Sequence, residues 1–386
     1  MIDHQLSPLI SQLRDFPSKS ALLTSPLYQQ HRSEIERVLN AIEICQRPGV
    51  SPKLTSFIRV LDWNIERGKE YRGIIDYLKS DPQVSLADVI LLQEVDQGMA
   101  RSDNKDIAQE ISSALGMHYV FATHYLELSK GKERLEGEIA GEDLSSLYGV
   151  AILSRYPITK AWAFPIHHCE GTHIFKLEPR LGNARALVAQ LDVRGKPLTV
   201  VNIHFSVFTT PHCRLLQAKS LTDGLKNIEG PILIAGDFNT TTLRRGSRLQ
   251  EAYEGAKFFF TPLFRYLEKI THPEREEPLF PWMSKAGFIY KGANLNGKIT
   301  AFTKLKGLAD LKWMPDFITR VIISRLEKLG FRAPMNLDWF FLKGISPLHK
   351  GERTDPPSLD PVALTPDLMK EKVLSDHAPL LIDLPI

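Results

Sequence analysis

The chain has few cysteines and no long apolar segment, and both absences narrow the class of protein. Its 386 residues contain only Cys45, Cys169 and Cys213, which are widely spaced and form no CxxC pair. This spacing predicts neither a disulfide framework nor a thiolate metal centre, and it favours a reducing compartment. No apolar run approaches the roughly 20 residues that span a bilayer, and the start MIDHQLSPLISQLRDF does not have the pattern of a signal peptide. We therefore expect a soluble, cytoplasmic protein without a transmembrane segment.

The chain also lacks a strong excess of charge of either sign. Its formal net charge is +3 and its isoelectric point is about 8.6. The composition, 43% hydrophobic and 24% charged, is that of an ordinary globular protein. A weakly basic chain permits a polyanionic partner without requiring one.

The first 52 residues are expected to form a helical arm or cap. In HRSEIERVLNAIEI, the residues Ile35, Val38, Leu39 and Ile42 recur at helical spacing. The segment QRPGVSP then interrupts the pattern. Residues 53–386 are expected to form the main domain.

From Phe57 onward, short apolar runs alternate with helical stretches. The runs that predict strands are FIRVLDW, DVILLQE, YGVAILS, ALVAQLDV, LTVVNIHF, PILIAGD, LDWFFLKG and APLLIDL. SDNKDIAQEISSALG predicts a helix capped by Ser102 or Asp103 and ended by Gly116, and PHCRLLQAKSLTDGLKNIEG predicts another. This alternation is typical of an α/β or α+β layered fold.

A long segment at about 241–334 departs from this alternation. It is poor in strand patterns, contains the aromatic run GAKFFFTPLFRYL, and has more basic than acidic residues. We interpret it as an insertion in the main domain. Long insertions of this kind often carry substrate specificity.

Polar residues stand at the ends of several of the predicted strands. In PILIAGDFNTTTLRRG, Asp237 and Asn239 follow a core strand directly, where an unpaired charge costs several kcal/mol to bury. The stretches WNIE, LLQEVD, VVNIHF, NLDWFFL and LSDHAPLLI supply further examples: Asn64, Glu66, Glu94, His204, Asp338, Asp376 and His377. Each residue alone is typical of a structural cap or ion pair. One convergent site explains all of them together.

In their order along the chain, these stretches resemble the endonuclease/exonuclease/phosphatase superfamily, which includes deoxyribonuclease I, inositol polyphosphate 5-phosphatases and neutral sphingomyelinases. The resemblance runs from about Phe57 to the C-terminus and leaves the insertion unmatched. It implies a deoxyribonuclease I-like sandwich of two mixed β-sheets packed face to face, with helices outside. It also implies a site at the edge of the sandwich where strand ends converge.

The resemblance implies metal-dependent hydrolysis of a phosphodiester or phosphomonoester. Glu94 and Asn64 would bind Mg²⁺ or Mn²⁺ through oxygen atoms. Glu66 would lie near the metal, and Asp376 would be a further ligand. His377, oriented by Asp338, would act on the scissile phosphate as a base or as a cation.

Four further residues would act around the phosphate. Asp237 would orient the attacking water or take its proton. Asn239 would donate to the phosphoryl oxygen in the transition state, and His204 would stabilise the phosphate or the leaving group. Arg185, in NARALVAQL, is an additional candidate phosphate contact.

The sequence leaves the substrate open. The basic insertion, with TLRRGSR directly after the motif, favours nucleic acid. The aromatic run and the apolar face of WMPDFITRVIISRLEKLGF would alternatively suit a phospholipid or inositol-phosphate hydrolase at a membrane surface. A catalytically inactive scaffold is disfavoured, because no expected catalytic position carries an inert residue. No obligate protein partner is inferred.

Overall fold

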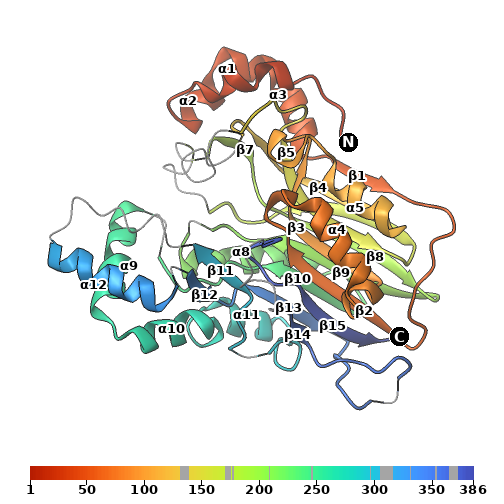
Figure 1. The fold of residues 1–386 in the computed structure, drawn as a ribbon. Coiled ribbons are helices and arrows are strands. Elements are labelled where there is room, and N and C mark those ends of the chain that lie inside the picture. Colours follow the sequence, from red (N-terminus) through yellow and green to blue (C-terminus); the bar gives the residue numbers. More distant parts are fainter. Residues whose placement is uncertain are drawn as a thin grey trace.

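The computed structural model describes residues 1–386 except 131–138, 170–174, 176–177, 208, 245–246, 296, 305–315, 331, 353 and 365–372. The described residues form two β-sheets packed face to face, with helices on both outer faces (Figure 1). This confirms the predicted layered sandwich of two mixed sheets. Each of the eight apolar runs that predict a strand forms one.

The larger sheet contains eight strands. Their order is β1–β4–β5–β3–β2–β15–β14, and β7 pairs with β4. The strands β2 and β3 are parallel, and the other described pairs are antiparallel. The bounds are β1 Ile42–Cys45, β2 Phe57–Asn64, β3 Val89–Gln97, β4 His118–Glu127, β5 Leu147–Ser154, β7 Arg180–Gly182, β14 Val362–Ala363 and β15 Leu380–Pro385.

The smaller sheet has the order β13–β10–β9–β8–β6. Here β9 and β10 are parallel, and the other described pairs are antiparallel. The bounds are β6 Ile158–Pro165, β8 Arg185–Val193, β9 Lys196–His204, β10 Ile232–Asp237 and β13 Asp338–Lys343.

Alternating apolar side chains from the two sheets meet in the central core. Val60, Leu91 and Val120 of the larger sheet belong to the same buried cluster as Val200 and Leu233 of the smaller one. Such interdigitation of inner faces is what holds a β-sandwich together. The burial of both sheets explains why their strands read as nearly continuous apolar runs.

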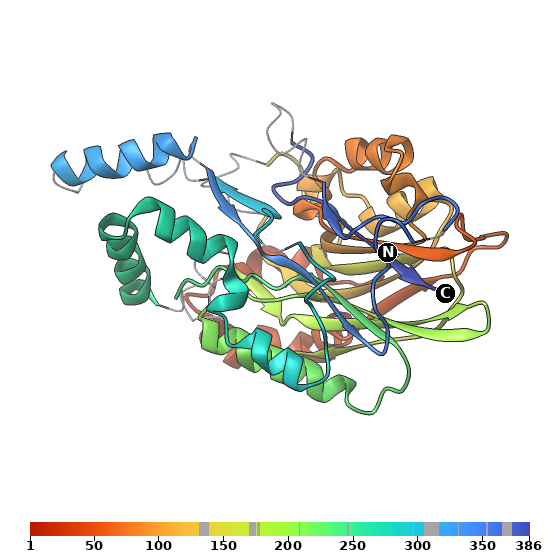
Figure 2. The ribbon, with the colours of Figure 1, turned by 90° about the horizontal axis from the view of Figure 1, so that it is seen from below.

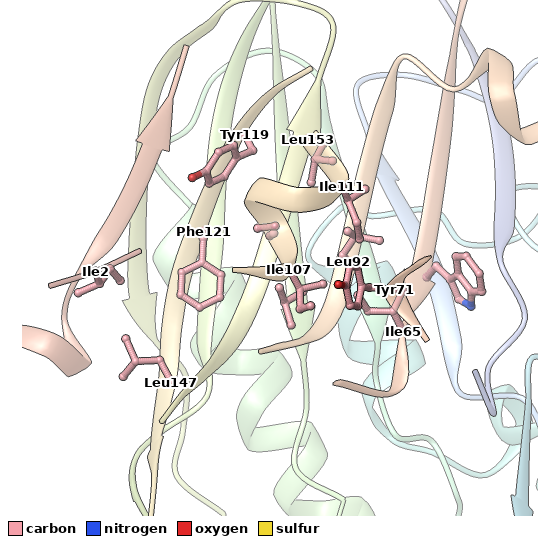
Figure 3. Close-up of a cluster of buried hydrophobic side chains, with 14 of the residues drawn as sticks. Ile2, Ile65, Tyr71, Leu92, Ile107, Ile111, Tyr119, Phe121, Leu147 and Leu153 are labelled. Carbon is pink, nitrogen blue, oxygen red and sulfur yellow. The ribbon is translucent and has the colours of Figure 1, made fainter. Parts of the chain in front are cut away.

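Helices cover the outer face of each sheet. The larger sheet is covered by α3 (Pro26–Leu39), α4 (Tyr71–Ser80) and α5 (Ile107–Leu115), and the smaller by α8 (Pro211–Leu225) and α11 (Leu279–Lys285). Figure 3 shows side chains of α5 lying among those of β3 and β4.

The prediction for the two ends of α5 is right at one end only. Gly116 ends the helix in the left-handed conformation, but the side chain of Asp106, and not that of Ser102 or Asp103, caps its start.

The N-terminal helices pack on the larger sheet. They are α1 (Ile10–Arg14), α2 (Lys19–Thr24) and α3, and Leu13, Leu22 and Ile35 are buried with the residues of α4 and α5. The predicted helical stripe is wrong at Ile42, because α3 ends at Leu39. Ile42 begins β1, which adds an edge strand to β4.

The insertion contains α9 (Arg248–Phe260), α10 (Leu263–Thr271), α11, β11 (Ala301–Lys304), α12 (Asp316–Lys328) and β12 (Arg332–Met335). Its strands β11 and β12 form a separate two-stranded sheet. The helices α9, α10 and α12 project to one side of the sandwich in both views (Figures 1 and 2). Arg245 of TLRRGSR lies outside the described residues.

The segment after β6 is linked to the start of α8 by a disulfide between Cys169 and Cys213. The cysteine spacing did not predict this bond, because 44 positions separate the two residues. The fold brings them together, with Cα atoms 5.9 Å apart.

Among the described residues, no helix is long and apolar enough to cross a membrane.

Candidate active site

The ends of neighbouring strands bring most of the predicted site residues together. The register of β9 and β10 sets His204 opposite Asp237, and the register of β10 and β13 sets Asp237 opposite Asp338. Asn64 ends β2 in the other sheet, and its Nδ2 lies 3.2 Å from Oδ2 of Asp237. The cluster therefore spans both sheets at one edge of the sandwich.

Asp237 lies in the middle of this cluster. Its Oδ2 is 3.5 Å from Nε2 of His204 and 3.8 Å from Nε2 of His377. Burial, together with the charges of Asp338 and Glu94, outweighs the effect of His377 and raises the pKa of Asp237 to about 8. A carboxyl group in such a place is stabilised by a proton or by a nearby cation.

His377 and Asp338 form the hydrogen-bonded pair that the sequence predicts. Nδ1 of His377 lies 2.9 and 3.0 Å from the two carboxylate oxygens of Asp338, and both side chains are buried. Burial alone would lower the pKa of His377, but Asp338 and Asp237 outweigh it and raise this pKa well above its usual value. The pair fixes the ring so that Nε2 faces Asp237.

Three residues that sequence reasoning missed position this pair. The Nε1–H of Trp63 donates to the carbonyl of His377 at 2.9 Å. The hydroxyl of Ser375 accepts from the main-chain N–H of His377 and donates to the carbonyl of Asn64. Thr300 of the insertion accepts from the main-chain N–H of Asp338 through Oγ1, at 3.1 Å. Trp63 and Ser375 stand inside quoted motifs, whereas no local pattern marks Thr300.

Glu94 faces the cluster because β3 is irregular at this point. Its register with β5 shifts between Leu92 and Val95, and Glu94 has a φ of 54°. A β-bulge redirects a side chain, and positive φ at a non-glycine residue is a strain that concentrates at functional sites. Oε1 of Glu94 lies 3.3 Å from Nδ2 of Asn64.

The side-chain amide of Asn64 does not point its oxygen into the cluster, as the predicted role of metal ligand would require. Its nitrogen faces the carboxylates of Glu94 and Asp237, while its oxygen accepts from the main-chain N–H of Glu66 at 3.1 Å. In this arrangement Asn64 bridges two acidic groups. An exchange of the amide oxygen and nitrogen would present the oxygen to a cation.

Glu66 and Asp376 lie at the rim of the cluster. The carboxylate of Glu66, in the turn η2 (Glu66–Gly68), pairs with Lys69 at 3.2 Å. The carbonyl of Asp376 accepts from the main-chain N–H of Phe302 of the insertion, and its charge adds to the rise in the pKa of His377. Both residues are partly exposed.

The GDFN motif is shaped by close packing of β10 on β9. A Cβ at Gly236 would lie 2.0 Å from the carbonyl oxygen of Ile203, so glycine is required there. Asn239 has a φ of 48°, and its main-chain N–H donates to Oδ1 of Asp237 at 2.8 Å. Its side-chain amide donates to the carbonyl of Phe205. These bonds hold the motif in one conformation.

His204 is a neutral histidine on the side of the cluster away from β13. Burial is the main cause that lowers its pKa to about 4. Its Nδ1 lies 3.3 Å from the hydroxyl of Tyr148, a residue of β5 that sequence reasoning missed. A neutral imidazole can donate through one nitrogen and accept through the other.

The prediction for Arg185 is corrected. Its guanidinium donates to main-chain carbonyls of the α3–β1 turn and of neighbouring strands, at 3.1–3.4 Å: those of Leu39, Asn40, Ala41, Thr123 and Ala163. Burial lowers its pKa to about 10. A guanidinium surrounded by carbonyls ties the N-terminal helices to the sheet and is not placed to bind a phosphate.

A buried polar network joins the two sheets beneath the cluster. Nε2 of Gln93 donates to Asp62 at 2.8 Å and to Asn202 at 2.7 Å. The amide of Asn202, on β9, also donates to the carbonyls of Leu92 and Ala151 in the other sheet. Burial raises the pKa of Asp62 well above its usual value, and Asp338 adds to this effect. The network fixes how the two sheets meet under the site.

The donors of the cluster fit a hard divalent cation. Glu94, Asp237 and Asp338 offer carboxylate oxygens, and Asp237, Asp338 and His377 have ligand atoms within 4.8 Å of one another. Burial, followed by the negative charges of Asp338 and Glu94, raises the pKa of Asp237, and a bound cation would stabilise the ionised carboxylate. Oxygen donors of this kind suit Mg²⁺ or Mn²⁺ rather than a soft metal.

Residues 63–377 match the profile of the Endonuclease/Exonuclease/phosphatase family. The chain belongs to this family. Its members are metal-dependent phosphoester hydrolases, so the protein is an enzyme of that class. The match includes every predicted site residue.

Solved structures of family proteins resemble the chain at low identity. An endonuclease/exonuclease/phosphatase from Beutenbergia cavernae is 14% identical, with a TM-score of 0.48 over 86% of this chain and 72% of that one. D. rerio TDP2 complexed with a single-strand DNA product is 16% identical, with a TM-score of 0.45 over 86% and 100%. The human Nocturnin catalytic domain is 15% identical, with a TM-score of 0.46 over 89% and 96%. No curated protein sequence matches the chain.

Proposed function

We propose that this enzyme hydrolyses phosphodiester bonds in nucleic acid with Mg²⁺ or Mn²⁺. The observation that carries the proposal is the convergence of Asp237, Asp338 and His377, beside Glu94, at strand ends of a chain that belongs to this family. For the substrate, support comes from exposed basic side chains of the insertion, including Arg244, Arg265, Arg320 and Lys328. Such cations neutralise the phosphates of a polyanion.

Glu94, with Asn64 and Asp376, would hold the metal, which supplies charge neutralisation at the phosphate. Asp237 accepts a proton from, or orients, the attacking water. Asp338 holds Nδ1 of His377, which leaves Nε2 to face the phosphate. Asn239 and His204 donate to phosphate oxygens, once the amide of Asn239 leaves the carbonyl of Phe205.

The test is a substrate panel with the purified full chain. Single-stranded DNA, double-stranded DNA and RNA are compared with sphingomyelin and phosphoinositide vesicles, in Mg²⁺, in Mn²⁺ and in EDTA. We expect cleavage of at least one nucleic acid with either metal and none in EDTA. Full activity in EDTA, or hydrolysis of lipids alone, would overturn the proposal.

A second candidate, hydrolysis of a phospholipid or inositol phosphate at a membrane surface, is favoured by one surface of the insertion. Phe260 and Phe264 are 79% and 67% exposed. Lys257 lies over the ring of Tyr253, and Arg265 over that of Phe264. Aromatic and basic side chains together suit the boundary of an anionic membrane. Vesicle binding that is lost in the Phe260→Ser, Phe264→Ser double variant would support this candidate.

A further inference from the structure

A polar cavity of about 60 Å³ lies next to the cluster. Its lining includes Glu94 and His204 of the cluster, together with His124, Tyr125 and Tyr148. A substrate whose phosphate contacts His204 can therefore extend into this cavity. None of these lining residues except Glu94 and His204 was predicted from the sequence.

His124 is the distinctive group in the cavity. The side chain of His124 is 1% exposed. Within the described residues, neither of its ring nitrogens makes a hydrogen bond of normal geometry. A weak contact with the main chain of Arg185 opposes the lowering of the pKa of His124. Burial, with added effects of His204 and Arg185, lowers its pKa well below the usual value, so the ring is neutral. A neutral imidazole offers one donor and one acceptor. Leaving such groups unsatisfied when buried costs about 1–3 kcal/mol.

The other walls favour a neutral, ring-shaped occupant over a second anion. The rings of Tyr125 and Tyr148 have centroids 5.9 Å apart, and Arg180 stacks on Tyr125 at 4.0 Å. Arg67 and Arg180 both pair with Glu178, so the cations beside the cavity already have an acidic partner. Aromatic faces with polar edges suit a small ring that carries hydroxyl groups.

We propose that this cavity binds the hydroxyl-bearing sugar ring attached to the scissile phosphate, and that His124 selects for its hydroxyl groups. A hydroxyl can donate to the acceptor nitrogen of a neutral imidazole or accept from the donor nitrogen, and two hydroxyl groups can satisfy both. A site built around such a hydroxyl discriminates strongly against the analogue that lacks it, since the buried group is then left unpaired. The inference rests on the proposed phosphodiester hydrolysis, and the ring belongs either to a ribonucleotide or to a cyclitol.

The kinetic test uses two pairs of probes and the metal-loaded full chain. One pair is uridylyl-uridine and its deoxy counterpart, and the other is glycerophosphoinositol and glycerophosphocholine. We expect the wild type to prefer the hydroxyl-bearing member of one pair by at least tenfold in kcat/KM, and the pair identifies the source of the ring. In His124→Phe this preference should fall to within threefold of unity, while His124→Gln, which keeps a donor and an acceptor, should retain part of it.

The matched control is His118→Phe, six positions earlier on the same strand. His118 is also buried but accepts from the main-chain N–H of Arg47, so this variant should keep the preference. Circular dichroism checks the fold, and His124→Leu replaces His124→Phe if the larger ring is not accommodated. A wild type without preference in either pair, or a preference unchanged by His124→Phe, would overturn the inference.

A binding measurement separates this inference from the proposed function. Calorimetry compares UMP with dUMP, and inositol 1-phosphate with glycerol 3-phosphate, on the wild type and on His124→Phe. If the wild type hydrolyses neither these small probes nor the DNA and RNA of the substrate panel, the proposed function is wrong. A hydroxyl preference in binding that depends on His124 would then still support the cavity's role, and its absence would refute that role.

Discussion

Asp338 and His377 are 39 positions apart in sequence, but Nδ1 of His377 lies within hydrogen-bond distance of both carboxylate oxygens of Asp338. We expect His377→Ala to lower kcat by several orders of magnitude, because the proposed contact of its imidazole with the phosphate is lost and His204, which is neutral, cannot supply the same positive charge. Asp338→Asn should cost less, and the double variant little more than His377→Ala, since residues that act as one unit lose most of their effect at the first removal. The measurement is kcat for all three variants, with unfolding curves as the control. Fully multiplicative losses would show that the two residues act independently.

Glu127 allows a prediction about pH and stability. Burial and the negative charge of Glu178 together raise the pKa of Glu127 to about 7. The positive charges of Arg101, Arg180 and Arg67 oppose this rise. A carboxyl group whose pKa is higher in the folded than in the unfolded state binds more protons when folded, so stability falls as pH rises from about 4.5 through 7. Glu127→Gln should remove this loss, and should be more stabilising at pH 8 than at pH 5. Urea unfolding of the wild type and of Glu127→Gln at pH 5 and pH 8 measures the change in the free energy of unfolding. An equal change at the two pH values would contradict the prediction.

Single residues also show what the sequence could and could not predict. The type and strand-end position of Asp237, His204 and Asp338 were enough to predict that they lie together, because strand ends at one edge of a sandwich converge. Arg185 stands at a similar position, at the start of β8, but its neighbours are carbonyls of the N-terminal segment. Which neighbours surround a residue depends on how distant segments pack, and the local pattern does not contain that information.

At the scale of elements, the Cys169–Cys213 bond fastens the segment after β6 to the start of α8. A disulfide that closes a loop with a sequence separation of 44 stabilises a fold by about 3–4 kcal/mol, because it restricts the unfolded chain. We expect Cys213→Ser, or reduction of the wild type, to lower the free energy of unfolding by that order. Urea unfolding with and without dithiothreitol measures it, with Cys45→Ser as the control. No effect of dithiothreitol would show that the bond does not form.

The insertion is the element whose role was hardest to predict. Its sequence suggested a surface for substrate, and α9, α10 and α12 do project from the sandwich (Figure 2). Yet Thr300 also supports the main chain of Asp338, and Ala301 bridges to His377. No periodicity marks a contact of this kind, because the strand β11 is only four residues long.

At the scale of the whole molecule, metal binding should stabilise the fold as well as support catalysis. The cluster gathers acidic groups that repel one another, and a ligand that binds only the folded state adds about 2.7 kcal/mol at 100 times its dissociation constant. We expect Mg²⁺ to raise the unfolding midpoint and EDTA to lower it, with the shift much reduced in Glu94→Ala. Thermal unfolding at several Mg²⁺ concentrations tests this. An equal shift in Glu94→Ala would place the metal elsewhere.

The architecture as a whole was the most predictable property. Eight apolar runs predict a layered fold of strands and helices, because strands with both faces buried leave a clear apolar signal. The two-sheet sandwich was implied by the resemblance of the ordered motifs to the family. The end of the N-terminal helical region was predicted less well. Ile42 fits a helical stripe equally well, and only pairing with β4 makes it part of a strand.

The register that aligns His204, Asp237 and Asp338 across β9, β10 and β13 couples the site to the strand pairing of the smaller sheet. Strands β9 and β10 are paired on both sides, whereas β13 lies at the edge of the smaller sheet. The main-chain amides of strands paired on both sides exchange with deuterium mainly when the sheet itself opens. The positions of His204 and Asp237 therefore persist as long as the sheet does, and Asp338 keeps its place as long as β13 stays paired with β10. The loss of activity on heating and global unfolding should therefore have the same midpoint temperature. Local unfolding of other segments should leave kcat unchanged.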